Sequence, residues 1–297
     1  MTKVAVVILN YNGRDFLAQF IPFLIKHTPD AELIVADNNS TDDSLDVLSQ
    51  FPSIKSIRLH ENYGYAGGYN NALMQVEADY YLLLNSDIEV SDNWLTPLVD
   101  YLDLNSNYAA AQPKLLDYYN RDRFEYAGAA GGFLDSLAYP YCKGRVFNDL
   151  ERDSGQYDIP SDIMWASGAA FIIRSEIFHE LGGFDETFFA HMEEIDLCWR
   201  LKSHGYKIAF VPESKVYHVG GGTLNKTSPR KTYLNFRNGI KLLVKNLPKS
   251  ELIYKLPLRV VLDVFASFYI WRNETQDHFK AVLKGVCDAL KDINRCL

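Results

Sequence analysis

Three carboxylates lie within four positions of the sequence, at Glu193, Glu194 and Asp196, in the aromatic and apolar stretch FFAHMEEIDLCWRLKSHGY. Carboxylates at this spacing repel one another and burial raises their pKa values, so a helix that needed only stability would gain little from them. Two chemical uses would justify the cluster: binding a cation, or accepting a proton from a substrate. The structural alternative is an acidic helix amino terminus, which the helix dipole favours.

Apolar runs alternate with helix-like stretches in the part of the chain that precedes this cluster. The expected strands are residues 4–9, 33–36 and 80–84, and the expected helices are residues 16–26, 44–50 and 68–76. Asp42 and Asp43 are expected to cap the second helix. This order predicts a β-α-β-α-β unit with a buried parallel sheet.

Polar clusters follow each of the three expected strands: NYNG at 10–13, DNNSTDDS at 37–44 and NSD at 85–87. Right-handed crossovers place the carboxyl ends of parallel strands at one edge of a sheet, where the ligands of open α/β sheets bind. We therefore expect the three clusters to converge on one binding site.

The rest of the chain is less regular. Periodicity supports no firm assignment for residues 105–162. The further expected elements are a buried strand at 165–174, a short helix capped by Ser175, a helix at 194–204, strands at 208–211 and 215–219, and helices at 233–245, 252–271 and 278–293. The predicted fold is α/β: a Rossmann-like, mixed and mainly parallel sheet flanked by helices. The predicted domains are residues 1–225 and a helical, basic carboxy-terminal extension at 226–297.

Composition indicates a globular protein, because 297 residues with 47% hydrophobic content can bury one core of about 200 to 250 residues and a smaller appendage. The four cysteines form no CxxC pair, and the chain runs directly into an apolar strand without a signal-peptide layout. These features favour a reducing, cytoplasmic compartment.

The net charge of −8 divides unevenly along the chain. Residues 1–225 carry 16 Lys and Arg against 32 Asp and Glu, whereas residues 226–297 carry 14 against 6. Two interpretations stay open: the basic segment binds an anionic partner, or it docks against the acidic domain.

The most apolar carboxy-terminal helix, at 256–271, is interrupted by Arg259 and Asp263 and is shorter than the ~20 residues that span a bilayer. Its aromatic residues, beside flanking Lys and Arg, suit the interface of an anionic membrane, such as the inner face of the plasma membrane. The aromatic residues are Phe265, Phe268, Tyr269 and Trp271. The alternative is a helix that packs on the core or in a homodimer.

Five segments occur in a recognisable order: VVILNYNG, VADNNSTDDS, NYGYAGGYNNAL, LLLNSDIEV and GGFDETFFAHMEEIDLCWRLKSHGY. As a set, over residues 3–225, they resemble the family 2 glycosyltransferases of the GT-A fold, especially the rhamnosyltransferase branch. The resemblance implies an inverting enzyme that moves a hexose or deoxyhexose from a UDP- or dTDP-sugar to a glycan or lipid-linked glycan. It implies no nucleic-acid partner.

The resemblance also implies a donor site at the strand ends. Asp37 would recognise the base and ribose, although Asp at a strand end also forms Asx-turns and helix caps. Glycines in residues 64–71 would let backbone N–H groups approach a diphosphate at a helix start. The implied donor-binding residues are Asn10, Asp37, Asn39, Gly67, Asn70, Asn85 and Ser86.

The motif Asn85-Ser86-Asp87 stands where the family usually has Asp-x-Asp. Mg²⁺ or Mn²⁺ accepts one or two protein carboxylates and completes its shell with diphosphate oxygens and water, so Asp87 alone can suffice. The resemblance suggests His218 as a further ligand or diphosphate contact, with a structural histidine as the alternative. The sequence leaves the choice between the two metals open.

In the family pattern Glu-Asp-x-Asp the second residue is the usual base, which implies Glu194 here. Glutamate replaces the common aspartate at this position, so Glu193 remains a rival. Asp196 is expected to anchor the helix through Arg200 at position i+4.

Trp165 precedes the cluster, in the family's acceptor region, where an aromatic ring can stack on a sugar; the alternative is a core residue. A different class of function also stays open. With its altered metal motif, the chain would then be a non-catalytic relative that binds nucleotide sugars or glycans and recruits partners in a glycan-assembly complex.

Overall fold

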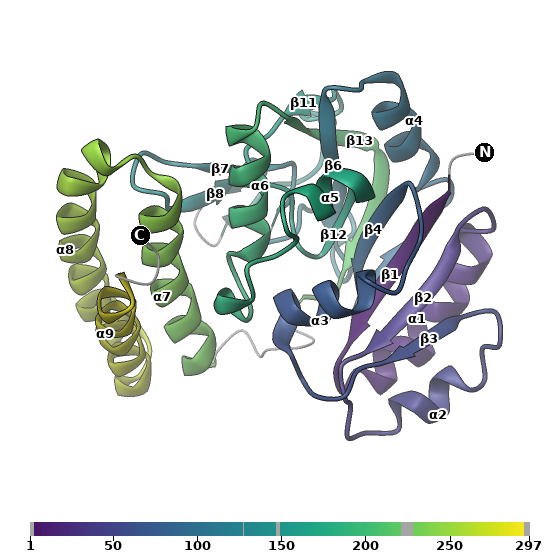
Figure 1. Ribbon diagram of the computed structural model, residues 1–297, viewed down its shortest axis with the longest axis horizontal. Coiled ribbons are helices and arrows are strands. Elements are labelled where there is room, and N and C mark those ends of the chain that lie inside the picture. Colours follow the sequence, from purple (N-terminus) through teal and green to yellow (C-terminus); the bar gives the residue numbers. More distant parts are fainter. Residues whose placement is uncertain (1–2, 127, 147–148, 221–227, 294–297) are drawn as a thin grey trace.

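A computed structural model describes residues 3–126, 128–146, 149–220 and 228–293, and a nine-stranded sheet runs through its centre (Figure 1). The strand order is β11-β13-β6-β12-β4-β1-β2-β3, with β5 paired to β13. Its strands are β1 Val4–Asn10, β2 Glu32–Asp37, β3 Lys55–Arg58, β4 Tyr80–Asn85, β5 Ile88–Val90, β6 Tyr108–Asp117, β11 Ser161–Asp162, β12 Ala170–Arg174 and β13 Lys207–His218. Two small sheets pair β7 Gly132–Leu134 with β8 Pro140–Cys142, and β9 Arg145–Val146 with β10 Asp149–Leu150.

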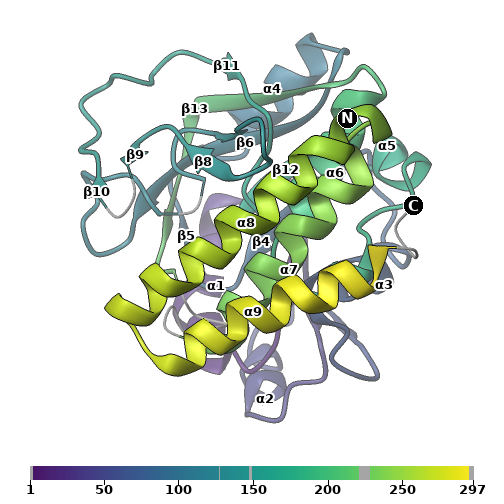
Figure 2. The ribbon, with the colours of Figure 1, turned by 90° about the vertical axis from the view of Figure 1, so that its left-hand side faces the viewer.

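Helices cover both faces of the sheet, and the last three pack together at one end of the molecule (Figures 1 and 2). They are α1 Arg14–His27, α2 Ser44–Leu48, α3 Gly64–Leu73, α4 Thr96–Leu104, α5 Ser175–Glu180, the 3-10 turn η1 Glu186–Phe188, α6 Glu193–Ser203, α7 Pro229–Asn246, α8 Lys249–Asn273 and α9 Gln276–Lys291. The expected domain boundary at 225/226 lies outside the described residues.

The parallel unit predicted from the apolar runs is confirmed. β1 pairs in parallel with β2 and with β4, and β2 pairs in parallel with β3. Alternate residues of β1 face opposite layers: Val6 and Ile8 join the core under α1, and Ala5 and Val7 join the core under α3. Because both faces are covered, the strand is apolar at nearly every position. β12 is antiparallel to its neighbours β4 and β6, which confirms a mixed sheet.

Several elements differ from expectation. The strand expected at 165–174 is the shorter β12, and the strands expected at 208–211 and 215–219 form the single strand β13. α3 begins at Gly64, four residues earlier than predicted, because its first turn is held by another loop, as described below. Ser175 does not cap α5: Arg174 is the capping residue, and the Ser175 hydroxyl donates to the carbonyl of Ala78.

The irregular region contains β6, a strand within the sheet that the sequence pattern did not predict and that pairs along its length with β13 and at Ala110 and Ala111 with β12. Its polar residues Gln112 and Lys114 break the apolar run, yet both are completely buried. Lys114 forms ion pairs with Asp153, at 2.8 Å, and with Asp158. A buried ion pair therefore hid this strand from a search for apolar runs.

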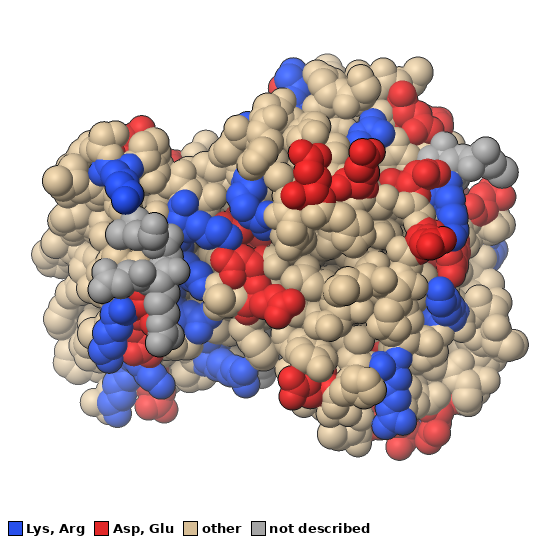
Figure 3. Space-filling view, viewed as in Figure 1, with Lys and Arg blue, Asp and Glu red and all other residues tan. Residues whose placement is uncertain are grey.

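The basic α7 packs against the part of the chain that contains the sheet rather than standing apart from it. Its Lys245 lies 2.7 Å from Asp185 and 2.9 Å from Asp196. Figure 3 shows basic and acidic side chains meeting along this junction. Docking against the acidic domain is thus the correct interpretation for α7. In the described part of the chain, no helix combines the length and apolar character needed to cross a bilayer.

Candidate active site

The ends of β1, β2 and β4 converge as predicted. The Asn10 side-chain amide donates to Asp37 Oδ1 at 3.2 Å and to Ser40 Oγ at 3.1 Å. A Cβ on Gly13 would lie only 2.4 Å from Asn10 Oδ1 and 3.2 Å from Ser86 Oγ, so glycine is needed for this close approach. The buried Asn10 Oδ1 has no hydrogen-bond partner among the described residues, which leaves one acceptor available at the strand ends.

Asp37 is fully buried and accepts hydrogen bonds with both oxygens, from Asn10 and from the backbone N–H of Ser40 at 3.0 Å. The turn that the sequence left as an alternative is therefore present. Asp37 fixes a loop in which Asn39, with φ +62°, is partly exposed. A nucleotide at this edge of the sheet would reach the partly exposed Asn39 more easily than the buried carboxylate of Asp37.

The start of α3 is already occupied by a protein carbonyl. Phe189 O accepts from the N–H groups of Tyr65, at 2.7 Å, and Ala66, at 3.3 Å. Gly64, with φ +70°, allows the contact, because a Cβ there would lie 2.4 Å from Phe189 O. The expectation that these first-turn groups bind a diphosphate is wrong in this structure, since a loop from residue 184 onward uses them.

Gly67 and Asn70 also face this loop instead of a donor. The Asn70 amide donates to Phe184 O at 2.9 Å, and its oxygen accepts from Phe184 N at 2.9 Å. A Cβ on Gly67 would lie 2.9 Å from Tyr63 Cβ and 3.5 Å from Glu186 Cδ. These contacts oppose the expected donor role of both residues and make α3 the support of the loop that leads to α6.

Asp87 and His218 meet where β4 and β13 end. His218 Nε2 lies 3.1 Å from Asp87 Oδ1, and His218 Nδ1 lies 3.2 Å from Glu125 Oε1. All three side chains are buried. Burial alone would lower the pKa of His218, but the charges of Asp87 and Glu125 raise it to about 10. Glu125, in the glycine-rich segment, carried no signal in the sequence.

With a pKa of about 10 the His218 ring is protonated at neutral pH, so a divalent cation would bind Nε2 only by displacing its proton. With that proton displaced, the arrangement fits a divalent cation completed by a substrate. Among the described residues, no three His, Cys, Asp or Glu side chains form a ready ion site. The 3.1 Å between Asp87 Oδ1 and His218 Nε2 is, however, close to the separation of about 3 Å between adjacent ligands with ~2.1 Å bonds. Glu125 lies on the other ring nitrogen, where histidine ligands are commonly held by a carboxylate. Asn85 and Ser86, just before Asp87, are partly exposed.

The first residues of α6 carry two carboxylates with unused acceptor atoms. Glu193 is buried and Glu194 is partly exposed, and the Oε2 atom of each lacks a hydrogen-bond partner within the described residues. Burial raises the pKa of Glu194 to about 7, against the effect of nearby backbone N–H groups. Burial and the neighbouring Glu194 charge raise the pKa of Glu193 well above its usual range.

Glu194 adjoins the strand ends through residues 168 and 169. A Cβ on Gly168 would be in contact with Glu194 Cγ, at 3.7 Å, and would crowd the Tyr65 hydroxyl, at 3.0 Å. The next residue, Ala169, accepts from the N–H of Asn85 at 2.9 Å. One short turn therefore connects the Asn-Ser-Asp motif with Glu194.

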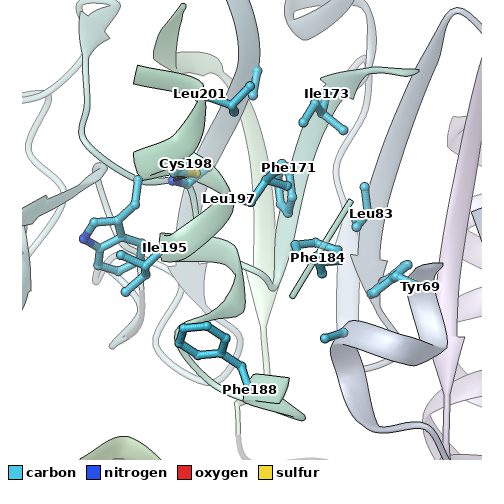
Figure 4. Close-up of a cluster of buried hydrophobic side chains, with 14 of the residues drawn as sticks. Tyr69, Leu83, Phe171, Ile173, Phe184, Phe188, Ile195, Leu197, Cys198 and Leu201 are labelled. Atoms are coloured by element: carbon cyan, nitrogen blue, oxygen red, sulfur yellow. Dashed lines mark hydrogen bonds between the residues drawn. The ribbon is translucent and has the colours of Figure 1, made fainter. Parts of the chain in front are cut away.

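Asp196 has a different environment from its two neighbours. It is completely buried and accepts from Arg200 Nε at 2.9 Å, Lys245 Nζ at 2.9 Å and Asn246 Nδ2 at 3.0 Å. The predicted pair with Arg200 is confirmed. The apolar side of α6 packs against β12, with Leu197 and Leu201 on the side that faces the sheet (Figure 4). Asp196 is an anchor of the helix.

The loop before α6 has an unusual backbone. Phe189 has φ +67° and ψ −59°, and Ala190 N donates to Phe188 O at 2.8 Å, which defines a tight γ-turn. His191 and Met192 follow with φ of +69° and +75°. Each non-glycine residue in such a conformation costs roughly 1–3 kcal/mol and persists only where the surroundings enforce it.

α7 supplies much of that enforcement. The Asn238 amide lies 3.0, 2.9 and 2.7 Å from the carbonyl oxygens of Phe188, Ala190 and His191. Arg237 donates to the carbonyls of Thr187 and Phe188 at 3.0 and 2.9 Å. Neither residue was predicted, because a polar position on a basic helix gives no sign of its distant partners.

Trp165 does not present a free ring to an acceptor. It is 5% exposed, its indole N–H donates to Phe133 O at 2.8 Å, and its ring covers Gly132, where a Cβ would lie 2.1 Å from it. Stacking on a sugar requires an open ring face, so the core-residue alternative describes Trp165.

Comparison with known proteins agrees with this geometry. The model of glycosyl transferase family 2 matches residues 5–182. The N-acetylglucosaminyl-diphospho-decaprenol L-rhamnosyltransferase of Mycobacterium tuberculosis is 25% identical over 236 residues, which cover 73% of this chain and 76% of that protein.

Two solved structures share the fold. GalNAc-T7 with UDP, GalNAc and Mn²⁺ superposes with a TM-score of 0.61 and 22% identity, over 73% of this chain and 43% of that one. The mannosyltransferase PcManGT of Pyrobaculum calidifontis, with GDP-Man and Mn²⁺, has a TM-score of 0.60 and 13% identity, over 98% and 88% of the two chains. The chain belongs to glycosyl transferase family 2, and it is a glycosyltransferase with a GT-A-like fold.

Proposed function

We propose that the protein is an inverting glycosyltransferase that moves a hexose or deoxyhexose from a UDP- or dTDP-sugar to a lipid-linked glycan, with Glu194 as the general base. The observation that carries the proposal is the pair of carboxylates at the start of α6, one buried and one partly exposed, with unused acceptor oxygens. The name of the mycobacterial relative, which specifies an L-rhamnosyl group and a diphospho-decaprenol acceptor, supports the substrate classes.

Glu194 and Glu193 have different roles in this proposal. A base is most efficient when its pKa lies near the operating pH, and the pKa of Glu194 is raised by burial to about 7. Burial and the charge of Glu194 raise the pKa of Glu193 well above its usual range, which disfavours a second negative charge at the start of α6. Glu194 takes the proton of the acceptor hydroxyl as that oxygen attacks the anomeric carbon, and the nucleoside diphosphate leaves from the opposite side.

Asp87 and His218 would hold a divalent cation, Mg²⁺ or Mn²⁺, with Glu125 fixing the imidazole. A bound cation would supply charge stabilisation for the departing diphosphate. The partly exposed Asn39 offers its amide group to the nucleotide. Asp37 holds the loop that carries Asn39 through its bonds with Asn10 and the Ser40 N–H. Asn85 and Ser86 lie next to Asp87 and complete the donor side.

A panel of nucleotide sugars tests the proposal. Purified protein is incubated with each donor and Mn²⁺, with and without a short-chain prenyl-diphosphate-linked N-acetylglucosamine, and released nucleoside diphosphate is measured. We expect turnover with one or a few UDP- or dTDP-sugars and little without metal. Turnover with none of them, in a protein that one of them stabilises against heat, would contradict the catalytic proposal.

A further inference from the structure

The helix α8 has its polar and apolar sides reversed relative to a helix that faces water. Its buried residues include Arg259 and Asp263, which form an ion pair with Nε 3.0 Å from Oδ2, and Ser267. Water-facing helices of globular proteins normally bury an apolar stripe and expose a polar one. The reversal indicates that the outward side of α8 is built for an apolar environment.

The buried polar side has a structural purpose. The Tyr139 hydroxyl donates to Asp263 Oδ1 at 2.6 Å, and Arg259 donates to the carbonyl of Leu137 at 2.8 Å. The Arg259 guanidinium also lies over the Tyr139 ring, 3.6 Å from its centre. These contacts attach α8 to the turn between β7 and β8, so polar bonds fix the orientation of the helix together with the apolar residues Leu256, Val260 and Ile270, which pack on the core.

The outer face of α8 consists of the exposed residues between Ile253 and Trp271, all of which are apolar or aromatic. They recur every three or four positions, so they form one stripe about 28 Å long. Its central members are Leu258, Val261, Leu262, Phe265, Phe268 and Tyr269. Figure 2 shows α8 on the outside of the molecule, in front of α7 and the sheet. A contiguous apolar surface of this length marks a binding surface.

We propose that the outer face of α8 is a membrane-docking surface, which lies in the headgroup interface of a bilayer that contains anionic lipids. Tyr254 lies near one end of the stripe, and Tyr269 and Trp271 near the other; such rings prefer the boundary between headgroups and acyl chains. Lys249 and Arg272 are exposed, bracket the stripe and are both basic, while the partly exposed Glu251 is paired with Lys255. Apolar insertion and the two cations suit the same anionic surface.

A second copy of the chain suits this face less well. Pairing two α8 helices in parallel would bring Lys249 beside Lys249, and pairing them antiparallel would bring Lys249 beside Arg272. Either arrangement opposes like charges at both ends of the interface. The inference stands on α8 alone and goes beyond the proposed function, although a lipid-linked acceptor would be presented at the same surface.

Flotation with vesicles of phosphatidylcholine, alone or mixed with phosphatidylglycerol, tests the proposal on the full chain. We expect binding to both, stronger to the anionic mixture and weakened there by salt. The triple variant Leu258→Ser, Phe265→Ser, Phe268→Ser should lose binding by more than about tenfold. The control triple Met74→Ser, Leu104→Ser, Ile159→Ser changes residues at least as exposed elsewhere on the surface and should bind as the wild type does.

Two further readouts make the outcome decisive. Addition of vesicles should shift tryptophan emission to shorter wavelength, and Trp271→Phe should remove that shift. Sedimentation should show a monomer without lipid. Wild-type protein that floats with neither vesicle would overturn the proposal, as would a stable dimer that the α8 triple variant converts to monomer, which would assign the face to a second copy.

Discussion

Two groups of carboxylates lie at the edge of the sheet, and they differ in what neutralises them. At the ends of β4 and β13, Asp87 and Glu125 both face the imidazole of His218, at 3.1 and 3.2 Å. At the start of α6, Glu193 and Glu194 are consecutive residues, the charge of Glu194 raises the pKa of Glu193, and each has an oxygen atom without a partner in the described part of the chain. The imidazole therefore stabilises the ionised carboxylates of the first group, whereas the surroundings of the second group disfavour ionisation.

Asp196 shows that this difference is local. It lies two positions after Glu194 on the same helix, yet it has Arg200, Lys245 and Asn246 as partners. A charge with several donors serves as an anchor, whereas a carboxyl group with raised pKa and an open side can accept a proton at neutral pH. The predictions below test whether each group does the work that its neighbours indicate.

The largest effect is expected for Glu194→Gln. The change keeps size and removes the ability to accept a proton, so transfer should fall by about 10² to 10⁴ while donor affinity persists. Folding raises the pKa of Glu194. At pH values above the pKa of a free carboxyl group, the unfolded chain therefore gains from ionising this residue and the folded state is destabilised. Thermal unfolding at pH 8 should therefore show the variant at least as stable as the wild type.

Glu193→Gln is the matched control, one residue earlier. Burial and the charge of Glu194 raise the pKa of Glu193 well above its usual range and so disfavour its ionised form; replacing it with the neutral amide should therefore change transfer much less. If Glu193→Gln removes transfer and Glu194→Gln retains most of it, the base is Glu193 and the family register is shifted by one.

The second effect concerns the other group. Asp87→Ala should abolish the Mn²⁺ dependence of nucleoside-diphosphate binding, and Glu125→Gln should weaken metal-dependent binding by about tenfold through the imidazole. Isothermal titration with and without Mn²⁺ measures both. Unchanged affinity and metal dependence in Asp87→Ala would show that this group does not hold the cation.

The sequence predicted much of this comparison and missed a definite part of it. Apolar runs located β1, β2 and β4, and their parallel order brought Asn10, Asp37 and Ser86 together. The helix spacing also identified the pair of Asp196 and Arg200, because such a contact is local.

The missed residues act over long distances in the chain. Glu125 meets His218 across 93 positions, and Asn238 meets the loop before α6 from 47 to 50 positions away. Trp165 and Asn70 have other partners than expected for a related reason. The sequence shows that a side chain can stack or donate, whereas its burial in the fold decides which groups it contacts.

The third effect is structural. Asp196→Asn leaves Arg200 and Lys245 without a counter-charge at a buried position, so the free energy of unfolding should fall by about 3 kcal/mol. Chemical denaturation measures the loss, and donor affinity per folded molecule should be unchanged. Asp100→Asn, at an exposed position of α4, is the control and should change stability by less than about 0.5 kcal/mol.

The smallest effect is expected for Asn238→Ala. Removing the amide releases three carbonyls of the strained loop before α6, so kcat should fall about tenfold with the donor KM little changed. Asn273→Ala is the control, because it removes an exposed hydrogen bond from the Asn273 side-chain amide to the carbonyl of Tyr269 in α8. A parallel rise in KM without a fall in kcat would show that the loop positions the donor and not the base.

The most direct test of the account is the pH dependence of transfer, measured at saturating donor and metal. A base whose pKa is about 7 must be ionised to act, so the rate should rise about tenfold per pH unit below that value and level off above it. The residual activity of Glu194→Gln should lack this inflection. A wild-type rate that is flat from pH 5.5 to 8.5, or an inflection that survives in Glu194→Gln, would contradict the assignment of Glu194 as the base.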